Sequence, residues 1–77
     1  MPKDFLSESE LGALAKKFRK GAGIKRAQAA RDMGVSQTSI FHAEESPEEG
    51  LTKLRMRMIE MYSPFKVTGP VFFLTRK

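Results

Sequence analysis

Two short helical patterns joined by only three residues are the feature that most constrains this chain. Residues 25–33 are rich in alanine and arginine and end at Gly34, which can adopt the left-handed conformation that terminates a helix. Ser36 is a favourable N-cap for a further helix over residues 37–44. This part of the chain is therefore predicted to form two short helices with a tight turn between them.

A longer amphipathic helix precedes this pair. Ser7 and Glu10 have the spacing of a capping box, in which each side chain accepts a hydrogen bond from the backbone amide of the other residue. Apolar residues then repeat at i, i+3, i+4 and i+7, and glycines end the pattern: Leu11, Leu14, Ala15, Phe18, Gly21 and Gly23. The first helix is therefore predicted to begin after Ser7.

A fourth helix is predicted after a loop at residues 45–50 that proline and glycine interrupt. It covers residues 51–62 and has one apolar side: Leu51, Leu54, Met58, Met61 and Tyr62. We expect the three methionines of this helix, Met56, Met58 and Met61, to fill the core and a dimer interface. We expect the acids from Glu44 to Glu49 to form a solvated loop; the alternative is that they contact a basic partner protein.

The tail differs in character, because its apolar residues are strand formers: Phe65, Val67, Val71, Phe72, Phe73 and Leu74. Residues 68–70 interrupt it with a turn, a bulge or a break. The predicted fold is mainly α, with four helices and a C-terminal β-strand or short hairpin. Residues 1–6 form an arm, residues 7–62 the helical domain, and residues 63–77 a tail that pairs with its copy across a two-fold axis.

Composition narrows the possible classes of protein. Seventy-seven residues bury only about 60% of their unfolded surface, so the core needs reinforcement. The absence of cysteine excludes disulfides, and a single histidine argues against zinc, so we expect a homodimer without metal or cofactor. No apolar run approaches a membrane span and no signal sequence follows the first residue, so we expect a cytoplasmic protein without a membrane partner.

Enzymatic activity is not expected, because no combination of residues supplies catalytic groups. No Ser, His and Asp set can be argued, and no glycine-rich phosphate loop follows a strand. Glu44 and Glu45 are neighbours in the sequence, so their side chains point in different directions.

Charge is unevenly distributed along the chain. The net charge is +5, and half of the basic residues fall between Lys16 and Arg31, a stretch without acids. One interpretation of such a run of basic residues is simply a solvated helix face. Segregation on this scale in so small a chain favours a surface that faces phosphates.

The segment from Arg26 to Ala43 has the pattern of a helix-turn-helix. Ala30 supplies the small residue where the two helices touch, and Gly34 supplies the turn four residues later. Val35, Ile40 and Ala43 are the apolar residues that lock the second helix onto the first. Each feature is common alone, and their order here indicates the motif.

Residues 24–40, from Ile24 through Gly34-Val35-Ser36-Gln37 to Ile40, resemble the helix-turn-helix of the XRE, or Cro/CI-type, repressors. The resemblance covers about residues 9–62 and implies a dimeric repressor that binds double-stranded DNA. The helix that begins at residues 51–54 and the β-prone tail are similar to small antitoxin-repressors of the HipB or HigA type. The strands of those proteins pair across the dimer, and the resemblance implies a toxin as a further partner.

Two departures from the family pattern affect the expected site. Lys25 and Arg26 occupy positions where the family often has Thr or Ser followed by Gln. Helix capping is thereby lost, whereas phosphate affinity is kept because arginine forms charge-assisted bidentate bonds. Phe41 and His42 lie where polar side chains are commoner, so no base-reading code is transferred from the family.

Roles are therefore assigned from side-chain chemistry. Base contacts are predicted for residues of the second motif helix: Gln37, Thr38, Phe41 and His42. Phosphate contacts are predicted for residues at the helix starts: Lys25, Arg26, Ser36, Ser39, Lys53 and Arg55. Glutamine can bind adenine through two bonds, and Phe41 can pack on a thymine methyl group. Phe41 can instead pack on the first helix or a partner, and His42 can be a plain or pH-sensitive surface residue.

The sequence thus predicts a transcriptional repressor that binds a near-palindromic operator as a homodimer. An alternative is an antitoxin whose main role is to neutralise a toxin, with the extended tail as its contact surface. A third is nucleic-acid binding without sequence preference, which charge alone would permit.

Overall fold

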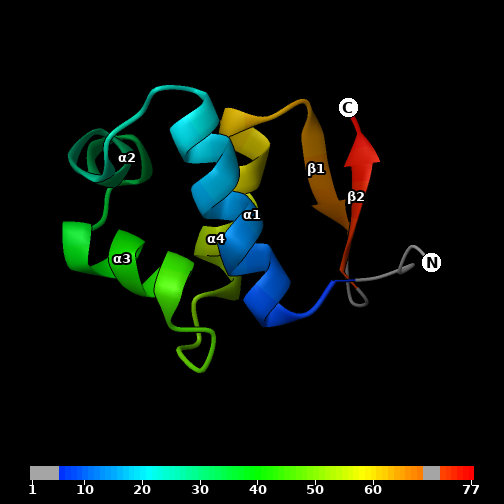
Figure 1. Ribbon diagram of the computed structural model, residues 1–77, viewed down its shortest axis with the longest axis horizontal. Helices are drawn as coiled ribbons and strands as arrows, with labels where there is room; N and C mark the ends of the chain where they lie inside the picture. Colours follow the sequence, from blue (N-terminus) through cyan, green and yellow to red (C-terminus); the bar gives the residue numbers. More distant parts are fainter. Residues whose placement is uncertain (1–5, 69–71) are drawn as a thin grey trace.

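The computed structural model describes residues 6–68 and 72–77. Four helices are followed by an antiparallel two-stranded hairpin (Figure 1): α1 (Glu8–Gly21), α2 (Arg26–Met33), α3 (Gln37–Glu45), α4 (Thr52–Tyr62), β1 (Phe65–Thr68) and β2 (Phe73–Arg76). The prediction of a mainly helical fold with a short C-terminal hairpin is confirmed. Of the two arrangements left open for the tail, the chain adopts the hairpin, in which β1 pairs with β2 of the same chain.

The helix ends follow the residues that the sequence singles out. Ser7 caps α1 with a complete capping box, because its hydroxyl accepts from the Glu10 amide at 3.2 Å and its amide donates to the Glu10 carboxylate at 2.9 Å. Gly34 ends α2 in the left-handed region, with φ 70° and ψ 36°. The Val35 amide donates to the Ala30 carbonyl at 3.0 Å and closes the turn.

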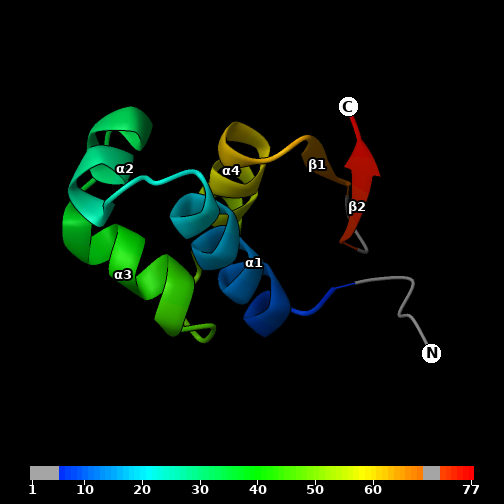
Figure 2. The ribbon, with the colours of Figure 1, turned by 45° about the horizontal axis from the view of Figure 1, so that its top comes forward.

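The elements are arranged with α2 and α3 at one end of the molecule, the hairpin at the other end, and α1 and α4 between them (Figures 1 and 2). The core lies where these helices meet, and its members come from every helix and from β1: Leu11, Ala15, Ala29, Ala30, Met33, Ile40, Ala43, Leu54, Met58, Ile59 and Val67. The apolar stripe predicted for α1 is confirmed, since Leu14 and Phe18 pack against the core beside the two buried members of α1.

The apolar side of α4 differs from the prediction at one residue. Met61 is 52% exposed, and Ile59 is fully buried in the core instead. The helical period accounts for the difference, because Ile59 follows the buried Arg55 by four positions and shares its side of the helix, whereas Met61 lies at the edge of the buried side. The expectation that Met61 belongs to the apolar core side is therefore wrong.

The hairpin is attached to the helices through a few contacts. Val67 of β1 is buried against the core, and its amide donates to the Glu60 carboxylate of α4 at 3.3 Å. Leu6, the described end of the predicted arm, donates its amide to the Phe72 carbonyl. The predicted interruption at residues 68–70 lies mostly outside the described residues, at Gly69 and Pro70. Within the described part of the chain, no helix is long and apolar enough to cross a membrane.

Candidate nucleic-acid interface

One side of α3 is exposed, and the other side is buried. Gln37, Thr38 and Phe41 are exposed, with 43% of the phenylalanine accessible, whereas Ile40 and Ala43 are buried. The buried side packs on α1 and α2. The structure therefore presents three of the four predicted base-contacting residues together on one accessible surface.

The start of α3 is capped by its own hydroxyl groups. The Ser36 hydroxyl accepts from the Ser39 amide at 3.1 Å and lies 3.0 Å from the Ser39 hydroxyl. Both oxygens thus hold the first turn of the helix in place. Ser36 is exposed and Ser39 is half-buried. These two of the six residues predicted to contact phosphate lie beside the helix N-terminus, which favours anions.

Arg26, Phe41 and His42 form a stacked group between α2 and α3. The Arg26 guanidinium carbon lies 5.1 Å from the centre of the Phe41 ring, within cation–π distance. The His42 ring meets Phe41 edge-on at 5.5 Å, and its Nδ1 lies 3.1 Å from the Ser46 hydroxyl. The exposed phenylalanine is thereby held from two sides, which limits the positions that its ring can take.

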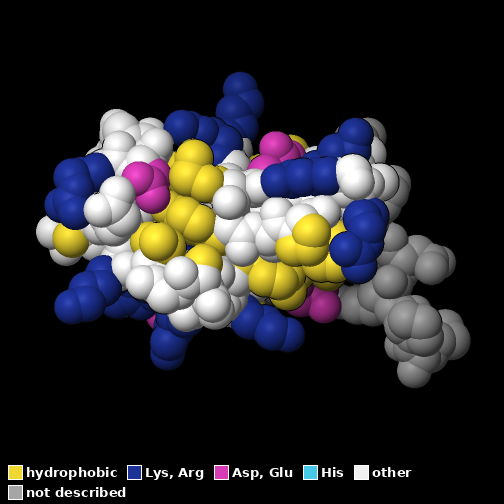
Figure 3. Space-filling model, turned by 90° about the horizontal axis from the view of Figure 1, so that it is seen from above, with side chains coloured by type: hydrophobic (Ala, Val, Ile, Leu, Met, Phe, Trp, Pro, Cys, Tyr) yellow, Lys and Arg dark blue, Asp and Glu magenta, His cyan; other side chains and the backbone are white. Residues whose placement is uncertain are grey.

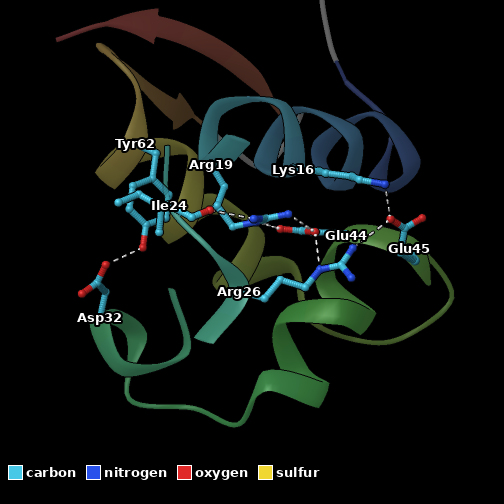
Figure 4. A network of polar contacts seen from close by, with 8 residues as sticks. All are labelled: Lys16, Arg19, Ile24, Arg26, Asp32, Glu44, Glu45 and Tyr62. Atoms are coloured by element: carbon cyan, nitrogen blue, oxygen red, sulfur yellow. Dashed lines mark hydrogen bonds and ion pairs between the residues drawn. The ribbon is translucent and has the colours of Figure 1, made fainter. Parts of the chain in front are cut away.

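A buried ion-pair network anchors this group to α1 (Figure 4). The Glu44 side chain is fully buried, and its two oxygens accept from Arg19 Nε at 2.5 Å and from Arg26 Nε at 3.0 Å. Arg19 Nη1 also donates to the Ile24 carbonyl at 2.7 Å. The expectation that Glu44 belongs to a solvated acidic stretch is wrong, because this carboxylate is buried and compensates the buried Arg19 and the half-buried Arg26.

Glu45 extends the network to the surface. Its carboxylate accepts from Lys16 Nζ at 2.6 Å and from Arg26 Nη2 at 3.3 Å. The hydrogen bond from Lys16 and the nearby positive charges hold the pKa of Glu45 below its usual value. Consequently the charges of Lys16 and Arg26 are already paired, and less positive charge is left for an external anion than the sequence suggests.

Lys25 differs from its neighbour Arg26 in this respect. It occupies the N-cap position of α2 without a side-chain cap, as predicted, and its exposed side chain has no hydrogen bond or ion pair with another described residue. Among the predicted phosphate contacts it is the cation on α2 best placed to accept an anion.

Arg55 does not belong to the surface. It is fully buried, and its three donor nitrogens are used by the protein itself. Nε donates to the Ala43 carbonyl at 2.8 Å, Nη2 to the Ser46 carbonyl at 2.7 Å, and Nη1 to the Glu8 carboxylate at 2.7 Å. The prediction that Arg55 contacts phosphate is wrong, because its charge holds the end of α3 against α1 and α4.

Lys53, the other predicted contact on α4, remains exposed but is separate from the group around Phe41. It lines a shallow hollow on α4 together with Met56, Arg57 and Glu60. No hydrogen bond or ion pair joins it to another described residue. The structure therefore does not bring Lys53 into the α2–α3 surface.

A second polar contact ties α2 to α4. The Tyr62 hydroxyl donates to the Asp32 carboxylate at 2.7 Å, and Gln28 donates to the same residue at 2.7 Å. Burial and the neighbouring carboxylate raise the pKa of Tyr62, and the bonds from Tyr62 and Gln28 lower the pKa of Asp32. This contact joins the Asp32 side of α2 to the end of α4.

Three residues that position α3 were not singled out from the sequence: Gly12, Arg19 and Glu44. For the two charged residues, the helical register contains the signal. Arg19 follows Leu11 and Ala15 at intervals of four, and Glu44 follows Ile40 in the same way, so both charged residues lie on buried faces and require partners.

The face shown in Figure 3 carries basic side chains around its margin and apolar side chains in two groups between them. Among the described residues, no group of three or more His, Asp and Glu is placed to hold a metal ion. Comparison of the chain with protein-family models, with curated proteins and with solved structures gave no match.

Proposed function

We propose that the chain is a sequence-specific transcriptional regulator of the repressor type, which binds double-stranded DNA as a homodimer. The observation that carries the proposal is the placement of Gln37, Thr38 and Phe41 on the exposed side of a helix whose other side is buried. A helix held in this way by a short turn can enter the major groove and present its first residues to base edges.

The surroundings of α3 support contacts with the DNA backbone. Lys25 offers an unpaired charge at the start of α2, and the N-terminus of α3 with its serine cap offers backbone amides. Arg26 is half-buried and shared between two carboxylates, so its principal role in the proposal is to hold Phe41. These contacts set the register in which Gln37 and Thr38 meet the bases.

The test is the selection of bound duplexes from a random-sequence pool, with purified protein at near-physiological salt. We expect an enriched inverted repeat with half-sites about one helical turn apart, because a two-fold dimer presents two α3 helices. Binding without enrichment that disappears as salt rises would leave only charge-driven binding and would contradict the proposal.

Single substitutions then separate base reading from backbone contact. Gln37→Ala is expected to relax preference at one base position. Lys25→Ala is expected to weaken the binding of matched and scrambled duplexes alike. The slope of log affinity against log salt concentration is expected to fall by about one, the value for one phosphate contact. The matched control is Lys66→Ala, since Lys66 is an exposed lysine of β1 at the other end of the molecule. Equal losses for both duplexes with Gln37→Ala would remove the base-reading role.

A second candidate function is that of an antitoxin-type protein that neutralises a toxin partner. The supporting observation is that β2 pairs with β1 along one edge, and no other described strand covers its second edge. Such an edge can accept a strand from another protein. Co-purification of this chain with the product of an adjacent gene, at a fixed stoichiometry, would support this function, and loss of the complex on Leu74→Pro would locate it at β2.

A further inference from the structure

The outer face of α4 is largely accessible: Lys53, Arg57 and Met61 are exposed, and Met56 and Glu60 are half-buried. The inner residues of this helix, Leu54, Arg55, Met58 and Ile59, are buried against the rest of the molecule. The outer face consists of residues at intervals of three and four: Lys53, Met56, Arg57, Glu60 and Met61. This spacing is that of a seam along which a second helix can pack.

The charged residues of this face have hydrogen-bonding groups without a partner among the described residues. Arg57 is exposed, and its guanidinium has no hydrogen bond or ion pair with another described residue. Glu60 uses Oε2 to accept the Val67 amide, while Oε1 has no partner among the described residues. An unpaired cation and an unpaired carboxylate oxygen thus lie one helical turn apart on the same surface.

The face is complementary to itself about a two-fold axis. If a second α4 runs antiparallel and the axis passes between Met58 and Ile59, Arg57 of one copy lies opposite Glu60 of the other copy, twice. The same register places Met56 opposite Met61 of the second copy, again twice.

The shape of the face agrees with this register. Two shallow hollows of about 350 Å³ and 270 Å³ share Arg57 and Glu60; Met61 and Lys77 complete the first, and Lys53 and Met56 the second. Met61 projects from this face with 52% of its surface exposed. In the antiparallel arrangement each Met61 enters the hollow beside Met56 of the second copy.

We propose that the outer face of α4 is the homodimer interface, formed by antiparallel α4 helices with reciprocal Arg57–Glu60 ion pairs around a Met56–Met61 centre. A helix of 11 residues is about 16 Å long, so the interface is small and the dimer is expected to dissociate in the micromolar range. This interface differs from pairing of the tails across the axis, and it leaves the β2 edge available to a different partner.

Charge reversal tests the reciprocal pairs without DNA. Sedimentation equilibrium from about 10 µM to about 1 mM protein is expected to show a reversible monomer–dimer equilibrium for the native chain. Arg57→Glu places like charges opposite each other twice, and Glu60→Arg does the same with positive charges. Each variant is expected to raise the dimer dissociation constant at least about 30-fold.

Restoration provides the decisive readout. An equimolar mixture of the two single variants, and separately the double variant Arg57→Glu with Glu60→Arg, are expected to dimerise again, because both restore opposite charges at each position. Lys66→Glu is the matched control, since it reverses an exposed charge on β1 and is expected to leave the dimer unchanged. Circular dichroism verifies that each variant is folded.

Three outcomes would overturn the proposal. A native chain that stays monomeric at the highest concentration excludes the dimer. A dimer that persists in Arg57→Glu places the interface elsewhere, with the β2 edge as the next candidate. Failure of the mixture and of the double variant to dimerise excludes the antiparallel register.

The inference rests on the proposed function only for the use of the dimer on DNA, and the two can fail separately. Arg57→Glu is expected to bind a single half-site with affinity within about twofold of the native chain. It is also expected to lose the preference for an inverted repeat over one half-site. Loss of single half-site binding in the native chain would instead contradict the DNA-binding proposal and leave the interface intact.

Discussion

Gly12 of α1 lies directly against the backbone of Ala43 on α3. A Cβ atom at Gly12 would lie 2.8 Å from the Ala43 carbonyl oxygen and 3.1 Å from the Glu44 carbonyl oxygen. Both neighbours are backbone atoms of a helix, so they cannot move aside as a flexible side chain would. The absence of a side chain at Gly12 thus sets the distance between α1 and the helix that carries the candidate interface.

We therefore expect Gly12→Ala to destabilise the protein by about 2 kcal/mol, since overpacking outweighs the gain in helix propensity. Urea denaturation followed by circular dichroism measures this change. Gly21→Ala is the matched control, because no atom lies within 4 Å of a Cβ there. It is expected to leave stability unchanged or to raise it by up to about 1 kcal/mol. Equal stability of the two variants would show that α3 can shift without cost.

Glu44→Gln is expected to destabilise the protein by about 3 kcal/mol. The substitution keeps the size of the side chain but removes the charge that compensates Arg19, whose side chain is 8% exposed. The measurement is again the free energy of unfolding in urea. Glu48→Gln, at an exposed loop position, is the control and is expected to stay within about 0.5 kcal/mol of the native value.

A double substitution separates the ion pair from general packing effects. Replacement of Arg19 and Glu44 together by methionine removes both charges. The loss of unfolding free energy in this double variant is expected to be smaller than the sum of the losses in Arg19→Met and Glu44→Met. Strict additivity would show that the two side chains do not interact in solution.

The sequence predicted the helices and their caps well because these depend on local signals. The Ser7–Glu10 box, the left-handed Gly34 and the Ser36 cap each involve residues at most a few positions apart, and the structure contains all three. Local signals did not distinguish a hairpin from a single strand in the tail, because pairing of β1 with β2 depends on how the chain reverses direction between them.

The sequence was less informative about charged residues in the interior. Arg55 and Glu44 were assigned to the surface because charge usually indicates exposure, yet each has partners many positions away in the sequence. Arg55, for example, binds Glu8 across 47 positions. Helical register can show that such a residue faces inward, but only the tertiary arrangement identifies its partner. The base- and phosphate-contacting roles remain predictions for the accessible residues.

The Tyr62–Asp32 contact predicts a dependence of stability on alkaline pH. The pKa of Tyr62 is raised in the folded protein, whereas an unfolded tyrosine ionises near pH 10. The contact therefore stabilises the fold fully below about pH 10, and this stabilisation is lost as pH rises toward the pKa of the folded state. We expect the native chain to be more stable than Tyr62→Phe at about pH 8 and the difference to shrink at about pH 11.

Urea denaturation of both chains at the two pH values measures this effect, and their difference cancels the titration of lysines common to both. The lowered pKa of Asp32 predicts the opposite trend in acid, where the difference shrinks as pH falls below about 3.8. A difference that is the same at every pH would show that the hydrogen bond does not persist in solution.

Phe41 offers a direct test of base reading at the candidate interface. Its exposed ring, held by Arg26 and His42, is suited to contact with a thymine methyl group in the major groove. Replacing the contacted thymine by deoxyuridine removes one methyl group and is expected to weaken binding of the native chain about fourfold, the value of one buried methylene. Phe41→Ala is expected to bind both duplexes with the same reduced affinity, as measured by fluorescence anisotropy on the selected operator. Deoxyuridine substitution outside the operator is the control, and an equal effect of deoxyuridine on Phe41→Ala would assign the methyl contact to another residue.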